Sequence, residues 1–399
     1  MNSNSGARDR SAGKIPSLDG VRAVSFLIVF AAHAGLEKYV PGAFGLYVFF
    51  ILSGYLITTL LIREDRKFGS ISLPLFYARR TLRIFPPLYA VFGFSLLYLW
   101  LTHDLAGVTV AGATSQALYY SNYNNLLFLG KNPGIVPGLG PLWSLAVEEH
   151  FYLLFPPLVV FLLHRLRLSY KRVTTVLLLI CLTDLLWRFV VVLHFSALLP
   201  GGIRGVAMSW AEHGSDTRAD AILFGCALAF FEKLEVSGRV FEKRRLERLI
   251  VPFCLLILLS TFLLRSDIFR GTVRYTLQGL ALAPLLYYVV HNPLTIAGRV
   301  LNSRLLSWVG AMSYSLYLVH YMVLTQIEKY FPSLNPIFWG IAGLLISIVA
   351  AEFIHLVIEV PTEGLRLRMK RRSVSDQKPT PLVGRPSSAS VETAVETAP

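Results

Sequence analysis

Residues 18–33 read LDGVRAVSFLIVFAAH, an apolar stretch with Arg22 near its start and His33 at its end. Together with the residues that follow, the stretch is long and apolar enough to form a membrane-spanning helix. The spacing of Arg22 and His33 puts both side chains on one helical face, about 16 Å apart along the axis. Ionisable side chains are rare inside lipid, so this face is either a functional site or a polar contact between helices.

The composition is that of a membrane protein. The chain has 399 residues, of which 54% are hydrophobic and 16% are charged, whereas soluble domains carry about 25% charged residues. The net charge of +14 does not indicate a nucleic-acid partner, because Lys and Arg cluster in short loops between apolar segments. The cysteines lie inside apolar segments without metal-ligand spacing, so we expect neither a metal site nor a disulfide framework.

Ten apolar segments predict an all-α polytopic membrane protein with about ten transmembrane helices and both termini in the cytoplasm. The segments cover approximately residues 17–36, 43–62, 84–102, 143–163, 174–194, 217–232, 249–264, 274–291, 305–325 and 337–358. An eight-span alternative would lose the alternation of basic loops. We expect a disordered N-terminal tail over 1–14, one membrane-embedded domain over 15–365, and a basic, then disordered, cytoplasmic tail over 366–399.

Three basic side chains are candidates for chemistry or binding. His33 can act as a base, because a neutral imidazole accepts a proton from a hydroxyl near pH 7. A polar contact between helices is the alternative. Arg80 and Arg83 follow a predicted basic loop, and their guanidinium groups match phosphate oxygens. They also fit a positively charged anchor at the cytosolic face.

The segment that begins near Trp143 carries a polar face. Ser144, Glu148 and Tyr152 share this face at positions i, i+4 and i+8. Glu148 could orient an imidazole that comes from another helix. The alternative is an acidic residue at the start of a helix, where the helix dipole favours it.

Two further segments carry aspartates. Asp216 is expected to cap a helix, and Asp220, one turn deeper, is the better candidate for a site. Asp184 and Arg188, at i and i+4, are expected to neutralise each other inside the bundle.

The ninth segment carries a polar stripe of Ser313, Tyr317 and His320. Such a stripe lines a cavity or bridges helices by hydrogen bonds, and the sequence leaves both open. The pair Ser53-Gly54 in the second segment predicts a close approach between helices beside the site.

The motifs together resemble the acyltransferase 3 family of integral membrane O-acyltransferases, over about residues 14–365. The matching stretches, in the order of the family, are LDGVRAVSFLIVFAAH, FFILSGYLIT, RRTLRIFPPLY, LWSLAVEEHFYLLFP, DTRADAILFG and SYSLYLVH. Two departures are Ala23, where the family often has glycine, and His150, where glutamine is usual. They affect local polar contacts and leave the resemblance intact.

The resemblance implies ten spans and transfer of an acyl group, commonly acetyl from acetyl-CoA. The acceptors it implies are hydroxyls of extracytoplasmic glycans, lipid-linked sugars or related metabolites. The family's motif residues fall on Arg22, His33, Arg80, Arg83, Ser144 and Glu148.

We therefore expect a multi-pass cell-membrane O-acyltransferase with acyl-CoA as donor substrate, a hydroxylated sugar or glycolipid as acceptor, and no tightly bound cofactor. His33 would be the general base or a transient acyl carrier, with Glu148 orienting it. Donor or acceptor would contact Arg22, Arg80, Arg83, Ser144, Asp220, Tyr317 and His320.

Two other classes of function remain as alternatives, a glycolipid transporter or flippase and a non-catalytic envelope-assembly protein. The lack of an internal repeat weighs against transport. Some family members carry an SGNH hydrolase-like domain after the spans. The residues from Ser373 are too few for one, so we expect the membrane domain to act alone or with a partner.

Overall fold

The computed structural model describes residues 15, 17–333 and 335–376, and this part of the chain forms helices without strands. The tails predicted to be disordered, 1–14 and most of the residues from Ser373 on, lie outside the described residues. The longer helices are α2 (Leu18–Ala31), α3 (Gly42–Phe68), α4 (Leu73–Leu101), α7 (Leu142–Val160), α8 (Tyr170–Phe189), α10 (Ala219–Phe231), α13 (Val251–Leu263), α15 (Val273–His291), α18 (Ser313–Tyr330), α19 (Pro336–Ile354) and α20 (Val360–Asp376). Shorter helices connect them, namely α5 (Val110–Ala117), α6 (Asn124–Leu127), α9 (Val206–His213), α11 (Glu235–Val240), α12 (Lys243–Arg245), α14 (Asp267–Gly271), α16 (Ile296–Leu301) and α17 (Arg304–Ala311).

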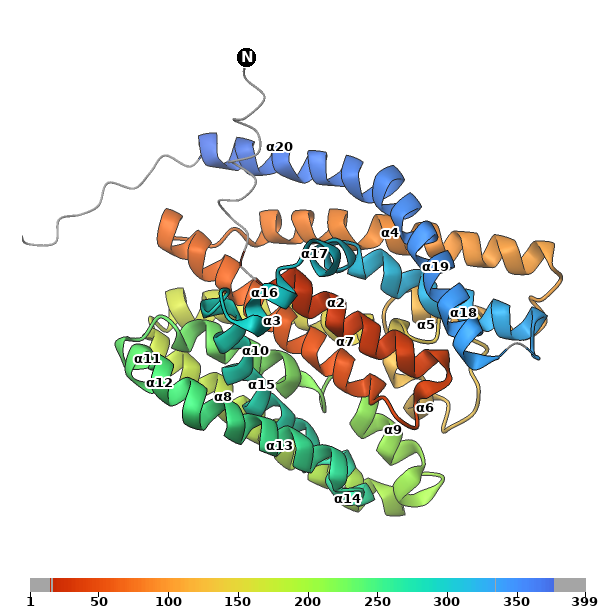
Figure 1. Cartoon of the computed structure of the whole chain (residues 1–399), viewed down its shortest axis with the longest axis horizontal. Helices are drawn as coiled ribbons and strands as arrows, with labels where there is room; N and C mark the ends of the chain where they lie inside the picture. Colours follow the sequence, from red (N-terminus) through yellow and green to blue (C-terminus); the bar gives the residue numbers. More distant parts are fainter. Residues whose placement is uncertain (1–14, 16, 334, 377–399) are drawn as a thin grey trace, which may run out of the picture.

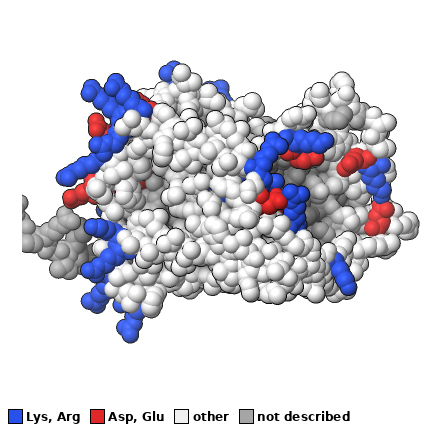
Figure 2. All heavy atoms as spheres, turned by 90° about the horizontal axis from the view of Figure 1, so that it is seen from below, with Lys and Arg blue, Asp and Glu red and all other residues white. Residues whose placement is uncertain are grey.

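The helices form a bundle whose two ends differ in charge. In Figure 1, α11 and α12 lie at one end, and α9 and α14 lie at the other. Figure 2 shows Lys and Arg gathered at the first end, a broad uncharged band, and a mixed group of charged side chains around a hollow toward the second end. We call the first end, where α3 turns into α4 and α11 and α12 lie, the basic end. An uncharged band between charged ends is the surface of a multi-pass membrane protein.

Seven helical segments of the described chain are long and apolar enough to cross a membrane. They are Leu18–Leu36, Gly42–Phe68, Leu73–Leu101, Leu142–Arg165, Tyr170–Ala197, Lys243–Leu263 and Ile337–Met369. The predicted count of about ten is therefore not confirmed. The helix α10 has only 13 residues, a length of about 20 Å, which is less than the hydrocarbon core of a bilayer. It is buried among other helices, which removes the need for a lipid-facing surface.

Two predicted segments differ in detail from the structure. Residues 305–325 form two helices, because Met312 leaves helical geometry between α17 and α18. The break lets α17 pack closely against α2, where an added Cβ on Gly310 would lie 1.8 Å from the Asp19 carbonyl oxygen. The predicted basic loop before residue 84 is also partly helical, because α4 begins at Leu73, eleven residues earlier, with a proline in its first turn.

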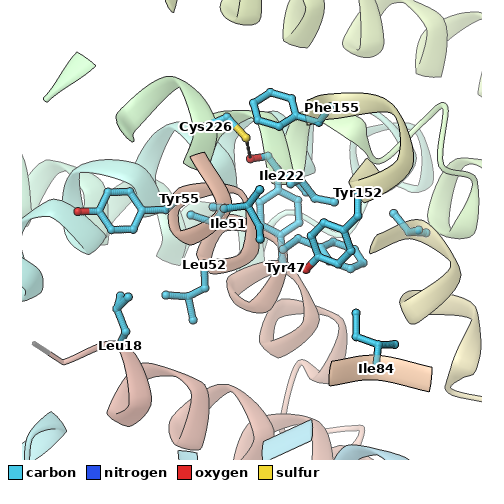
Figure 3. Packing of buried hydrophobic residues seen from close by; sticks show 14 of the residues in the cluster. Leu18, Tyr47, Ile51, Leu52, Tyr55, Ile84, Tyr152, Phe155, Ile222 and Cys226 are labelled. Carbon is cyan, nitrogen blue, oxygen red and sulfur yellow. Dashed lines mark hydrogen bonds between the residues drawn. The ribbon is translucent and has the colours of Figure 1, made fainter. Parts of the chain in front are cut away.

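The core centres on α3 and α10, which approach each other through small residues. A Cβ on Gly54 of α3 would lie 2.0 Å from the carbonyl oxygen of Ile222, and one on Gly225 of α10 would lie 2.0 Å from that of Ile51. The close approach predicted for Gly54 is therefore confirmed. Figure 3 shows Ile51 of α3 beside Ile222 of α10 within the buried apolar cluster.

The end of α2 positions His33. The regular helix stops at Ala31, and a π-helical turn, η1 (Ala32–Leu36), follows. Gly35 then takes φ +85°, a conformation that glycine adopts without strain. Such turns widen a helix locally and often occur at functional sites. His33 lies in this turn and contacts α18, with its Nδ1 2.9 Å from His320 Nε2.

Candidate active site

A pocket that we call the arginine cavity lies among α2, α3, α4, α7 and α18. Its empty space is about 760 Å³, a volume that includes space open to the outside. Its charged and hydroxyl-bearing lining residues are Arg22, Ser53, Arg80, Arg83, Ser144, Glu148, Glu149, Tyr152, Ser313, Tyr314 and Tyr317. Three guanidinium groups thus face two carboxylates inside a largely apolar wall. Such a cavity suits a ligand with negative charge at one end and an apolar chain at the other.

The arginines of this cavity are held by helix geometry. Arg80 and Arg83 lie inside α4, three residues apart, and so share one face. The Cζ atom of Arg80 lies 3.6 Å above the ring centre of Tyr152. Its Nε has no hydrogen-bond partner among the described residues. Arg22 approaches Asp19, with 3.6 Å between nitrogen and oxygen. The Arg80 side chain therefore keeps hydrogen-bonding capacity for a ligand.

Glu148 is fixed by two hydroxyl groups. Ser53 Oγ donates to Oε1 at 2.9 Å, and the Tyr152 hydroxyl donates to Oε2 at 2.9 Å. Each carboxylate oxygen therefore holds a donor from α3 or α7. Glu148 was expected to orient the imidazole of His33, but the structure puts His33 against His320 and Glu148 in the arginine cavity.

A second, larger cavity has His33 in its wall, and we call it the histidine cavity. Its empty space is about 2080 Å³, a volume that includes space open to the outside. It lies toward the end opposite the basic end, where the surface in Figure 2 is hollowed. Its charged lining residues are Glu37, Lys38, Glu212, Arg218, Arg265, Arg270 and Arg274. The cavity is wide, open and predominantly cationic.

The hydrogen bonds of two histidines define which nitrogen of His33 is basic. His320 Nδ1 lies 2.8 Å from the carbonyl oxygen of Tyr317, so this nitrogen donates. In a neutral ring Nε2 is then an acceptor, and it lies 2.9 Å from His33 Nδ1. His33 must therefore donate from Nδ1, which leaves its own Nε2 unprotonated and able to take a proton. The two rings stack with centroids 5.2 Å apart, and His320 itself is fully buried.

Tyr317 separates the two cavities. Together with Leu46, it lines both of them. Its hydroxyl donates to the Pro141 carbonyl oxygen at 2.9 Å and lies 2.6 Å from Ser144 Oγ. Tyr317 and Leu46 therefore lie where the two cavities adjoin.

Asp220 belongs to a buried ion cluster outside both cavities. Arg188 donates to its two carboxylate oxygens at 2.9 and 2.6 Å, and Thr276 donates to it at 2.9 Å. Asp184 completes the cluster at 3.3 Å from Arg188. Asp184 and Arg188 do pair as predicted, but Arg188 also binds Asp220 in a bidentate pair, the stronger geometry.

Comparison with known families decides the class of the chain. A family model described as an acyltransferase domain, acyltransferase 3, matches residues 15–355. The chain belongs to the acyltransferase 3 family. No significant match to a solved structure was found.

Curated relatives of this acyltransferase 3 chain are named as O-acetyltransferases. It is 26% identical over 359 residues to the peptidoglycan O-acetyltransferase OatA of Listeria monocytogenes, covering 87% of this chain and 55% of the relative. It is 30% identical over 360 residues to the O-acetyltransferase OatA of Staphylococcus aureus, covering 87% of this chain and 57% of the relative. The chain thus spans little more than half the length of these relatives.

The predicted site residues of this acyltransferase 3 chain fall into three places. The arginine cavity holds Arg22, Arg80, Arg83, Ser144, Glu148 and Tyr317. The histidine cavity holds His33, with His320 behind it. Asp220 lies in the ion cluster. The helix cap expected from Asp216 is not formed, because α10 starts at Ala219 and the Asp216 carboxylate accepts hydrogen bonds from Trp187, Trp210 and Tyr123.

Sequence reasoning did not assign Ser53, Arg218 or Arg274 to the site. Ser53 lies within a stretch that matches the family, beside Gly54, and was interpreted as packing. The sequence signal for Arg218 was its position between two aspartates at the start of an apolar helix. That position is equally consistent with an ion pair between Arg218 and one of the aspartates. Only the packing of α3 on α7 and of α10 on α15 reveals what these side chains face.

Proposed function

We propose that this chain is a membrane O-acyltransferase that moves an acetyl group from acyl-CoA to a hydroxyl of a cell-wall glycan. The family and the names of the relatives support this class of reaction. The observation that carries the proposal is the hydrogen-bond chain from Tyr317 through His320 to His33, which leaves a basic nitrogen on the histidine cavity. No observation favours the transporter or scaffold alternatives.

The distribution of charge over the bundle indicates at which end acyl-CoA binds. Basic loops face the cytoplasm in most membrane proteins, so the basic end is assigned to the cytosol. Acyl-CoA then enters the arginine cavity, with its phosphates on Arg80 and Arg83 and Arg22 close by. Glu148 is a positioning residue here. It holds Tyr152, and the Tyr152 ring in turn supports the Arg80 guanidinium.

The acyl group then meets the acceptor at His33. In direct transfer, His33 Nε2 takes the proton of the acceptor hydroxyl, and the oxygen attacks the thioester carbonyl. The C–S bond breaks, an ester C–O bond forms, and the proton leaves with the coenzyme A thiolate. In the relay course, His33 Nε2 itself attacks the thioester carbonyl, the C–S bond breaks, and the coenzyme A thiolate leaves. The acceptor hydroxyl then attacks the acyl-imidazole, the C–N bond breaks as the ester C–O bond forms, and the hydroxyl proton passes by way of the freed Nε2 to the thiolate. In both courses we place the reacting carbonyl beside the hydroxyl groups of Ser144 and Tyr317, which lie 2.6 Å apart.

Transfer of labelled acetyl from acetyl-CoA by the purified chain in proteoliposomes tests the proposal. With N-acetylmuramic acid glycosides as acceptors, His33→Ala is expected to lower kcat by at least about 100-fold, the contribution of a general base. His291→Ala is the matched control, because this histidine has an exposed side chain at the end of α15 and lines neither cavity. Equal transfer by His33→Ala and the control would refute the mechanism.

A donor comparison tests the arginine cavity without mutation. Acetyl-pantetheine keeps the thioester of acetyl-CoA and lacks its adenosine phosphates. If these phosphates bind the arginines, KM for acetyl-pantetheine is expected to be at least about tenfold higher, since charge-assisted hydrogen bonds are lost. An equal KM for the two donors would place the phosphates elsewhere.

A further inference from the structure

Arg218 is a buried cation that no carboxylate of the described residues pairs with. It precedes α10, is 1% exposed, and lines the histidine cavity. Among the described residues it makes no hydrogen bond or ion pair through its side chain, and its Nε is unsatisfied. By contrast, the equally buried Arg188 is neutralised by Asp184 and Asp220. A buried guanidinium is normally paired, so the unpaired one facing a cavity indicates an anion that binds there.

The surroundings hold Arg218 in place without neutralising it. Its Cζ lies 3.9 Å from the ring centre of Tyr275 and 5.2 Å from that of Tyr47. Aromatic faces attract a cation but leave the edge of the guanidinium fork free for hydrogen bonds. The fork is therefore pre-organised for an oxyanion.

Arg274 is a second cation on the same aromatic ring. Its Cζ lies 4.8 Å from the centre of Tyr275, and it donates to the hydroxyl of that residue at 2.9 Å. Its nearest carboxylate, Glu212, is 3.9 Å away, and its Nε has no partner among the described residues. Tyr275 thus fixes two guanidinium groups that both line the histidine cavity.

The charged residues that line the rest of the histidine cavity also favour anions. Five Lys and Arg side chains line it, against two glutamates. A cleft with one predominant sign of charge and low-dielectric walls concentrates ligands of the opposite charge. An anionic acceptor would be drawn in, whereas a neutral sugar would gain nothing from this field.

We propose that Arg218 and Arg274 form an anion site that binds a phosphate or carboxylate group of the acceptor while the acceptor hydroxyl lies at His33. The proposal rests on the proposed function for the identity of the acceptor. It narrows the acceptor to a glycan that carries its own negative charge, either as a sugar phosphate or as an acidic sugar. Arginine forks match both groups bidentately, and the two sources are separated by experiment.

Binding to the purified full-length chain in detergent tests this site without acyl transfer. Isothermal titration compares N-acetylmuramic acid with its methyl ester, and N-acetylglucosamine 1-phosphate with N-acetylglucosamine. At least one charged probe is expected to bind at least about tenfold more tightly than its neutral partner, because it can form a bidentate charge-assisted pair with an arginine. The pair that shows the preference identifies the source of the charge. Equal binding within both pairs would overturn the proposal.

Variants assign the preference to this site. Arg218→Gln is expected to bring the two members of the preferred pair within about twofold of each other, because the charge-assisted bonds are gone. Arg274→Gln is also expected to reduce the preference for the charged probe. It replaces Arg218→Gln as the test variant if Arg218→Gln does not fold. Arg204→Gln is the matched control, because Arg204 is 79% exposed, pairs with Asp267 and lies outside the cavity lining. A preference that survives Arg218→Gln and Arg274→Gln would refute the site.

The outcome is independent of catalysis. If the charge preference is found but no acetyl is transferred to any probe, the anion site stands and the proposed function fails. If acetyl is transferred to charged and neutral probes with equal kcat/KM and their binding is equal, the proposed function stands and the anion site fails.

Discussion

His320 offers the sharpest test of how the site works. It is fully buried and lines neither cavity, so it acts on the reaction through the residues that it contacts, chiefly His33 and the Tyr317 carbonyl oxygen. Its Nε2 is the acceptor, at 2.9 Å, that fixes the His33 tautomer. Replacement by leucine keeps a side chain of similar size but removes both ring nitrogens, so the Nδ1–H of His33 loses its acceptor and the Tyr317 carbonyl oxygen loses this donor.

The magnitude follows from that lost hydrogen bond. An unsatisfied buried donor costs about 1–3 kcal/mol, which corresponds to about a 5- to 150-fold decrease in rate if His33 must recover its orientation before reacting. We expect His320→Leu to lower kcat within this range. KM for acetyl-CoA is expected to stay unchanged, because the donor cavity is not altered.

A conservative variant separates positioning from mere structural support. The amide of His320→Gln can accept from His33 with its oxygen and donate to the Tyr317 carbonyl with its nitrogen. We expect this variant to recover most of kcat. Steady-state kinetics in proteoliposomes, with thermal unfolding measured on the same samples, is the assay. The reasoning is refuted if His320→Leu retains wild-type kcat, or if the leucine and glutamine variants lose kcat and thermal stability equally.

Two further predictions concern the frame around the site, and thermal unfolding in detergent checks both. Gly54→Ala is expected to destabilise the fold by about 1–3 kcal/mol, because its Cβ would lie 2.0 Å from a carbonyl oxygen of α10. The control is Gly93→Ala in α4, which should be neutral or stabilising because nothing lies within 4 Å of the new Cβ. Equal effects of the two variants on stability would contradict the packing argument. Asp220→Asn is expected to destabilise by about 3–5 kcal/mol, because it removes the bidentate carboxylate of Arg188 and leaves only Asp184, at 3.3 Å, to compensate the buried charge. Asp267→Asn, in an exposed ion pair, should change little, and a stable Asp220→Asn variant would show that Asp184 alone neutralises the arginine.

Much of the frame is local and could be predicted from the sequence. Apolar segments of sufficient length, punctuated by basic loops, predict a multi-pass helical membrane protein. Helical periodicity places Arg22 and His33 on one face, and Ser144 and Glu148 on another. The Ser53-Gly54 pair predicts a close helix contact. The close contact at Gly54 is confirmed, and Ser144 and Glu148 line one cavity. Arg22 and His33 line different cavities, and a π-helical turn that begins at Ala32 interrupts the regular helix between them.

Helix number and helix ends were less predictable. The hydropathy pattern predicts a short transmembrane helix at α10, whereas in the structure α10 is a short helix enclosed by neighbouring helices. Nor does an apolar pattern show that residues 305–325 break at Met312, because the break is stabilised by the packing of α17 on α2. Burial by other helices replaces contact with lipid, and a single sequence does not distinguish the two apolar environments.

The chemistry itself depended on tertiary structure. The sequence determined that His33, His320, Glu148 and the arginines sit on polar faces of apolar helices. Only the packed bundle decided that His33 meets His320, 287 residues away, and that Glu148 meets Ser53, 95 residues away. Only the bundle left the Arg218 Nε without a hydrogen-bond partner among the residues that the structure describes. The reason is geometric: periodicity within one helix determines which side chains share a face, but the partner of that face is set by how distant helices pack.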